Sequence, residues 1–182
     1  MPIPTLILLL LFFLSGASGL IYEVLWTREL ALVFGVTTYA VSTVLATYMG
    51  GLALGSYLVG RRVEKLRNPL LAYACLEAGI GLFALAVPLL LDALKPLYVE
   101  LARLGLSFPA FALGRSLLAA AVLLVPTTIM GATFPVLVRH WTDSGRGLRR
   151  GTGALYFANT AGAIAGCALA GFRLVEAFGL VG

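Results

Sequence analysis

Two polar side chains lie inside long apolar segments, and their types and depth make them the residues best placed to do chemistry. Glu77 lies about seven residues into the apolar segment 70–91, roughly 10 Å from its edge. Asn159 lies at a similar depth in the segment 151–172. A carboxyl group at this depth in hydrocarbon must be protonated, paired, or exposed to a hydrated cavity. Two interpretations stay open: a polar site that binds a cation or carries a proton, with Asn159 sharing a hydrogen bond with Glu77, or a neutral carboxyl group that bridges two helices.

A second group of charged residues lies near the expected outer ends of the apolar segments. Residues 15–30 bring five small residues in a row and then Glu23 and Glu29, whereas Arg115 opens the fourth apolar segment. A cross-helix ion pair between Arg115 and one of these glutamates would fix the packing of the helices. The alternative is an outward-facing gate or ligand clamp made by the same residues.

Enzyme and metal motifs are missing from the sequence. It contains no GxGxxG motif after a strand, no P-loop, no HExxH motif, and no Cys or His pair at metal-ligand spacing. His140 lies beside Trp141 in a basic loop, and a single imidazole specifies no chemistry. Cys75 and Cys167 fall inside apolar runs and are interpreted as packing residues. The sequence therefore predicts no catalytic residue and no metal site in this chain.

Composition decides the class of protein. Hydrophobic residues make up 60% of the 182 residues and charged residues 12%, against about 45–50% and roughly 25% in soluble domains. The charges form short clusters between long apolar runs, which favours helices in a lipid bilayer over a barrel of alternating polarity. The net charge of +5 does not indicate nucleic-acid binding, because most basic residues lie at the ends of apolar runs and no folded basic domain exists.

These features predict an all-α polytopic transmembrane bundle that forms a single domain over residues 1–182. The first segment lacks the positive charges of a signal peptide, so it is interpreted as a retained span. Trp26 is expected to anchor an amphipathic stretch, 23–34, at the membrane surface, and residues 92–109 are expected to form a short surface helix. The chain stops at GLVG as another apolar run begins, which is typical of a fragment. The five expected spans are at about residues 3–22, 36–59, 70–91, 110–138 and 151–172.

Orientation follows from the distribution of Lys and Arg. The loops 61–68 and 139–150 carry eight of these residues, whereas those on the opposite side each lie close to an acidic residue. Because positive loops stay in the cytoplasm, we expect both loops and the N-terminus to be cytoplasmic. The basic residues of the two loops are Arg61, Arg62, Lys65, Arg67, Arg139, Arg146, Arg149 and Arg150.

Small residues at four-residue spacing predict close helix packing. Gly51 and Gly55 stand at GxxxG spacing in the second span, and Gly162 and Gly166 belong to a longer stripe in the fifth. Such faces pack within one bundle, or they join a homo-oligomer or a larger membrane complex. The segment PTTIMGATFP, 126–135, contains two prolines that either kink the fourth span or free backbone carbonyls for a solute.

Several stretches together resemble one protein family. The sequences SGASGLIYEVLWTREL, LEAGIGLFAL, PTTIMGATFPVLVRH and LYFANTAGAIAGCALAGF occur in the order found in the membrane domain of bacterial membrane-bound spermidine synthase-like proteins, the fused major-facilitator/spermidine synthase family. The similarity covers nearly the whole chain. In that family a soluble Rossmann-like domain follows and transfers an aminopropyl group from decarboxylated S-adenosylmethionine to putrescine. No position here matches that domain, so the resemblance implies an inner-membrane module without a cofactor or catalytic residue of its own.

The layout also resembles the first half of a major-facilitator transporter. The stretch GGLALGSYLVGRR stands where that superfamily has a glycine-acidic-arginine loop, but the acidic residue is missing, so the gating role of the loop does not carry over. Three functions follow as hypotheses: a membrane module that anchors a spermidine synthase-like enzyme or handles a polyamine or another hydrophobic or cationic solute, a half-transporter that pairs with a second half, and a non-catalytic subunit of a membrane complex.

Overall fold

The computed structural model describes residues 4–34, 38–145 and 147–174, and five long helices make up nearly all of this part of the chain. Each of the five is long and apolar enough to cross a membrane. The all-α fold predicted from composition is therefore confirmed, and the chain is an integral membrane protein. The helices are α1 Thr5–Phe34, α2 Thr38–Gly60, α3 Pro69–Arg103, α4 Phe108–Asp143 and α5 Leu148–Leu169, with a 3₁₀ turn, η1, at Val63–Lys65 and a π-helical turn, η2, at Ala170–Leu174.

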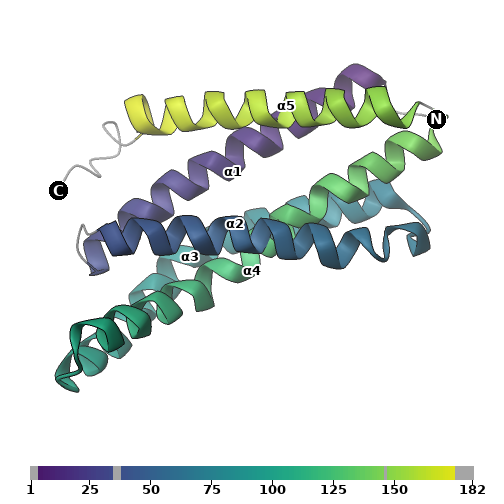
Figure 1. Ribbon diagram of the computed structural model, residues 1–182. Helices are drawn as coiled ribbons and strands as arrows, with labels where there is room; N and C mark the ends of the chain where they lie inside the picture. The colour runs from purple at the N-terminus through teal and green to yellow at the C-terminus, as the bar shows by residue number, and fades with distance from the viewer. Residues whose placement is uncertain (1–3, 35–37, 146, 175–182) are drawn as a thin grey trace.

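The helices pack as two groups (Figure 1). In the first group, α1 lies along α5. In the second, α4 packs against both α2 and α3. Contacts between the two groups are much sparser than contacts within them. This unequal packing leaves space in the middle of the bundle, where the candidate site lies.

Helix α1 does not end where its first span was expected to end. It runs without a break through residues 23–34, and the Trp26 side chain is only 4% exposed. Trp26 stacks on Tyr22 with a centroid distance of 5.5 Å and packs in a core cluster with Leu30 and Tyr48. The interfacial role expected for Trp26 is therefore wrong. Trp26 and Leu30 are spaced four residues apart, which puts both on the helix face that the core covers.

The short surface helix expected over 92–109 is also not formed. Helix α3 continues through Pro88 and Pro96 to Arg103, because Leu91 and Leu94 are buried in the core and hold this part of the helix in place. Its 35 residues are about 52 Å long, well beyond a hydrocarbon core of ~30 Å. The tip of the α3–α4 hairpin accordingly projects past the other helices (Figure 1). Exposed ion pairs lie along this extension, Lys95–Asp92 at 2.6 Å and Arg103–Glu100 at 2.7 Å.

Helix α4 stays continuous through both of its internal prolines, Pro126 and Pro135. Threonine hydroxyls donate to backbone carbonyls near these prolines, at 2.7 Å from Thr127 to Leu123 and 2.6 Å from Thr128 to Leu124. These are bonds of a threonine hydroxyl to the carbonyl four residues earlier in the same helix, and they satisfy the hydroxyls within α4. The two prolines therefore do not end the span.

Two apolar clusters hold the bundle at different depths. One contains Trp26, Tyr48 and Leu123, toward the end where α1 finishes. The other contains Phe12 and Trp141, toward the end where α1 begins. The middle of the bundle lies between them. Ile3, residues 36–37, Arg146 and the start of any sixth span lie outside the described residues.

Candidate functional site

A cavity of about 350 Å³ lies in the middle of the bundle and is lined by residues of all five helices. This volume is within the range of about 300–1,000 Å³ found for small-molecule sites. Its walls are mainly apolar, with a few polar side chains that point in from different helices. We call it the central cavity. Its polar lining comprises Ser15 and Ser18 of α1, Tyr48 and Ser56 of α2, Glu77 of α3, Thr133 of α4, and Tyr156, Asn159 and Thr160 of α5.

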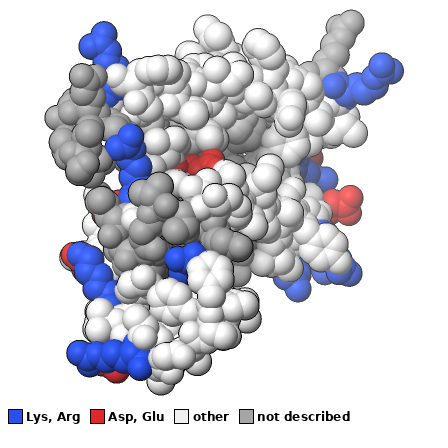
Figure 2. Space-filling view, turned by 60° about the vertical axis from the view of Figure 1, so that its left-hand side comes forward, with Lys and Arg blue, Asp and Glu red and all other residues white. Residues whose placement is uncertain are grey.

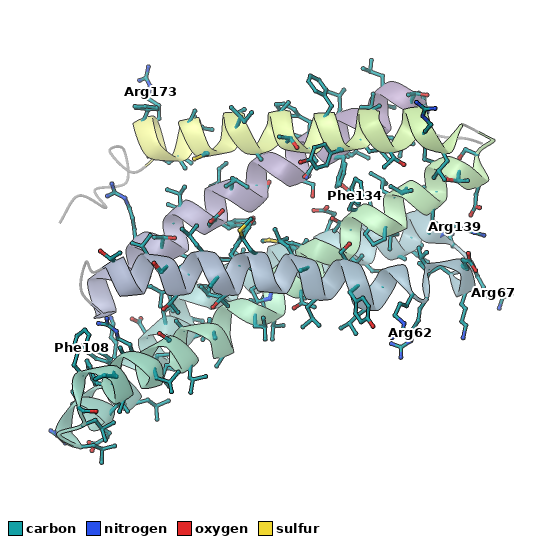
Figure 3. The ribbon with its side chains drawn as sticks, in the orientation of Figure 1. Arg62, Arg67, Phe108, Phe134, Arg139 and Arg173 are labelled. Atoms are coloured by element: carbon teal, nitrogen blue, oxygen red, sulfur yellow. The ribbon has the colours of Figure 1, made fainter. Side chains whose placement is uncertain are left out.

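One boundary of the central cavity is aromatic. Phe12 of α1 and Phe134 of α4 stack with their ring centroids 6.0 Å apart. Figure 3 shows the Phe134 side chain between α4 and the α1–α5 pair. This contact belongs to the cluster that also holds Leu8 and Leu137, so it closes the cavity toward the end where α1 begins.

Glu77 is the acidic residue of the central cavity. Its Oε1 atom accepts a hydrogen bond of 2.6 Å from the Ser15 hydroxyl of α1, a length typical of a hydroxyl that donates to a carboxylate. The Tyr73 hydroxyl, one helical turn away, also interacts with Glu77 and Ser15. No Lys, Arg or His of the described residues forms an ion pair with Glu77. The carboxylate thus has hydroxyl neighbours and no countercharge from the described part of the chain.

Asn159 lines the same cavity from α5, but it does not bond to Glu77. Its Oδ1 atom is buried without a hydrogen-bond partner, and it lies beside Gly16 of α1. The hydrogen bond expected between Glu77 and Asn159 is therefore not formed, because α1 packs against α5 at Gly16 and presents Ser15 to Glu77 instead. The structure brings the two residues to one cavity and leaves the amide oxygen without a hydrogen-bond partner at the α1–α5 contact.

The charged residues expected at the outer end lie along the second half of α1 and the start of α4. The Glu23 carboxylate interacts electrostatically with the Tyr48 hydroxyl, a residue of the cavity wall. Glu29 interacts in the same way with Lys95 of α3. Arg115 is only 6% exposed, and its guanidinium lies 5.9 Å from the centre of the Phe111 ring. The ion pair between Arg115 and Glu23 or Glu29 stays a prediction.

The four glycines singled out by spacing lie at contacts within the chain. A Cβ atom on Gly55 would lie 2.8 Å from the Thr128 carbonyl carbon, and one on Gly51 would lie 2.6 Å from the Thr127 Cβ. In the same seam between α2 and α4, Gly131 meets the Leu52 backbone. Helix α2 therefore lies directly on the backbone of α4.

The glycines of α5 play the corresponding part against α1. A Cβ atom on Gly162 would lie 2.7 Å from the Phe13 carbonyl carbon, and one on Gly166 would lie 2.7 Å from the Ala17 Cα. Both seams join helices of this same chain. The small-residue faces considered for docking to other proteins are thus occupied inside the bundle.

Sequence reasoning missed the serines of α1 as site residues. Ser15 and Ser18 fall inside the expected first span, 3–22, but the sequence assigned them no role, and in the structure they line the central cavity. The run of small residues 15–19 could have indicated a polar cavity beside this helix, because small side chains leave room and serine adds hydroxyl groups.

Charge is distributed very unevenly over the molecule. In the view of Figure 2, Lys and Arg gather toward the two ends, and acidic atoms appear in the middle of an otherwise largely uncharged face. Arg62, Arg67 and Arg139 lie at one end of the bundle, and Arg173 lies at the other (Figure 3). Within the described ranges, no three His, Cys, Asp or Glu residues form a group that could hold a metal ion.

Comparison of the chain with models of protein families, with curated proteins and with solved structures finds no match. The site must therefore be interpreted from its own geometry. That geometry defines a membrane helix bundle with a central, mostly apolar cavity and one carboxylate in its wall.

Proposed function

We propose that this chain is the membrane module of a spermidine synthase-like protein and that it holds a small organic cation in its central cavity. The observation that carries the proposal is the Glu77 carboxylate, which lies in the cavity wall without a basic partner among the described residues. A charge held in an apolar membrane bundle without a partner is costly, and an ammonium group in the cavity would offset that cost. The resemblance of the sequence to the spermidine synthase-like family supports a polyamine as the cation.

The shape and lining of the cavity fit an alkyl amine better than a compact inorganic cation. Glu77 and Ser15 supply acceptor oxygens for one ammonium group, and a small rotation of the Asn159 side chain, whose buried Oδ1 has no partner, would supply another acceptor from α5. Between them, Leu52, Ile80 and Met130 provide an apolar wall. A diamine such as putrescine has ammonium groups at its ends and methylene groups between them, so its chemistry matches this lining.

Binding of radiolabelled putrescine and spermidine to the protein in lipid nanodiscs tests the proposal. We expect Glu77→Gln to weaken binding by roughly 10–100-fold, since a hydrogen bond to a charged group is worth about 1.5–3 kcal/mol and ~1.4 kcal/mol is a factor of ten. The matched control is Glu64→Gln, because Glu64 is exposed in η1 and outside the cavity. Equal binding by wild type and Glu77→Gln, or no binding by the wild type, would refute the proposal.

A half-transporter is the second candidate, and one feature of the cavity favours it. Tyr156 lines the cavity and is 65% exposed, and Thr160 is exposed beside it. The cavity is therefore open along α5, where a second helix bundle would close it. Uptake of putrescine into proteoliposomes separates the candidates: saturable uptake supports the half-transporter, and binding without uptake supports the anchoring or solute-handling module.

We infer that the protein lies in a bacterial inner membrane with its N-terminus in the cytoplasm. The support is the clustering of basic residues in the loops 61–68 and 139–150, since positive loops stay on the cytoplasmic side. Alkaline phosphatase fused after Arg67 should then be inactive, whereas phosphatase fused after Gly105 should be active. The reverse pattern would overturn this orientation.

A further inference from the structure

A second cavity lies against the first and shares its polar wall. It has a volume of about 440 Å³ and lies between α1 and α3, two helices that otherwise touch little. We call it the lateral cavity. Ser15, Ser18 and Glu77 line both cavities, so the Glu77 carboxylate can be reached from two sides.

Apart from Tyr73, the rest of the lateral cavity is apolar, and it opens on the outside of the bundle. Leu11, Leu14, Leu70 and Ala74 form its walls. Leu14 is 58% exposed, and Ala74 is exposed as well. The opening is therefore on the surface of the helices and not inside the core.

The depth of the opening places it at the level of lipid chains. Ser15 is ten residues from the start of α1 at Thr5, or ~15 Å along the helix, and Glu77 is eight residues from the start of α3 at Pro69, or ~12 Å. A hydrocarbon core is ~30 Å thick, so both residues lie about midway across it. An opening at this depth on an exposed apolar surface faces hydrocarbon.

We propose that an amphiphilic monocation, an alkylamine with one ammonium head and one hydrocarbon tail, enters through the lateral cavity from the bilayer and binds with its head at Glu77. The proposal rests on the cation site of the proposed function and adds the route and the substrate class. The head reaches the carboxylate and the two serine hydroxyls, whereas the tail stays between the leucines of α1 and α3. Lipid chains and leucine side chains are equally apolar, so moving the tail from the bilayer into the cavity changes its free energy little. The ammonium head therefore determines the affinity.

The same chemistry separates this ligand from a diamine. A second ammonium group at the far end of the chain would have to lie among the side chains of Leu11, Leu14 and Leu70, which offer no acceptor. The Tyr73 hydroxyl, which also lines this cavity, already interacts with the Leu11 carbonyl and with Glu77. Diamines therefore use the central cavity, and monoamines with a long chain use the lateral cavity. Both share the acceptor group of Glu77.

Carboxyl labelling tests the lateral route in protein reconstituted in lipid nanodiscs. Dicyclohexylcarbodiimide dissolves in hydrocarbon and reacts with carboxylic acids, and mass spectrometry of peptides measures the modified fraction of Glu77. The blocking variant is Ala74→Trp, which fills the lateral cavity. Its matched control is Ala78→Trp, because Ala78 is exposed one turn further along α3 and lines neither cavity.

We expect the reagent to label Glu77 in the wild type and in Ala78→Trp, and dodecylamine to protect it. Ala74→Trp should reduce the labelling rate by about tenfold or more, because an overfilled cavity excludes the reagent, and it should leave putrescine binding unchanged. Absence of labelling in the wild type, equal labelling of the two tryptophan variants, or no protection by dodecylamine would overturn the inference. Failure of putrescine binding with this labelling pattern intact would refute the diamine proposal alone.

Discussion

Substitution of Gly55 by alanine gives the sharpest test of how α2 and α4 are held together. The added Cβ would lie 2.8 Å from the Thr128 carbonyl carbon and 2.9 Å from the Ala132 nitrogen, and closer still to the Thr128 carbonyl oxygen. Ordinary contacts of a Cβ atom begin at 3.4 Å, so α2 and α4 must separate until the Thr128 carbonyl oxygen, the nearest of these atoms, is clear of the new methyl group. The obstructing atoms belong to the backbone and cannot rotate away. The seam as a whole must therefore open.

The expected cost follows from a comparison with Gly50→Ala. A Cβ on Gly50 meets no atom within 4 Å, whereas both substitutions replace glycine by alanine in the interior of one helix and share the same gain in helix propensity, up to ~1 kcal/mol. The difference between them isolates the packing cost, which we expect to be about 1–3 kcal/mol. Gly50→Ala itself should be neutral or slightly stabilising.

Reversible unfolding in mixed micelles with increasing sodium dodecyl sulfate measures this difference. The two tryptophans of the chain are suitable reporters, because Trp26 and Trp141 are buried in different apolar clusters. We expect the unfolding midpoint of Gly55→Ala to be lower than that of Gly50→Ala with both tryptophans reporting one transition. Equal midpoints for the two variants would show that α2 and α4 do not approach each other as closely as described.

Three other substitutions or reagents test separate features. Asn159→Leu should leave the free energy of unfolding unchanged or slightly higher, since it removes a buried oxygen without a partner, and it should weaken putrescine binding. Cys75 and Cys167 are both free and exposed, yet a charged maleimide should not label them in nanodiscs, because lipid covers these positions, and should label them after unfolding. Lys95→Ala should leave the unfolding midpoint unchanged in the same titration, because both Lys95 and its partner Asp92 are exposed to solvent, which screens their ion pair. A lower midpoint would contradict this interpretation.

The fold was predictable because its main determinant is composition. In a bilayer, the backbone N–H and C=O groups of a long apolar run can form all their hydrogen bonds within a helix. Glycine spacing then indicates which helix faces pack closely. The ends of the helices were harder to predict. Residues 23–34 and 92–103 contain charged residues, and a prediction from hydropathy ends each span at the first charges. The helices themselves continue, because buried residues such as Trp26 and Leu94 hold these parts in the core.

The candidate site was predictable only in part. The depth of Glu77 and Asn159 in their apolar segments was enough to identify them, since polar groups are costly in hydrocarbon and usually serve a function there. Their partners depend on the rotation of α1 about its axis, which periodicity could not define because that helix is apolar on every side. The structure supplies this rotation, and with it the contacts of Ser15 with Glu77 and of Gly16 with Asn159.

The distribution of glycines explains why the bundle has a cavity at all. Glycine seams bring α2 onto α4 and α5 onto α1 at backbone contact, so each pair is close-packed along its length. Between the two groups, α1 presents Ser15 and Ser18, which are too small to fill the space across to α3. Larger apolar residues there would join the groups into one core and would cover Glu77. The small polar side chains instead leave the carboxylate accessible, which is the condition that the proposed cation site requires.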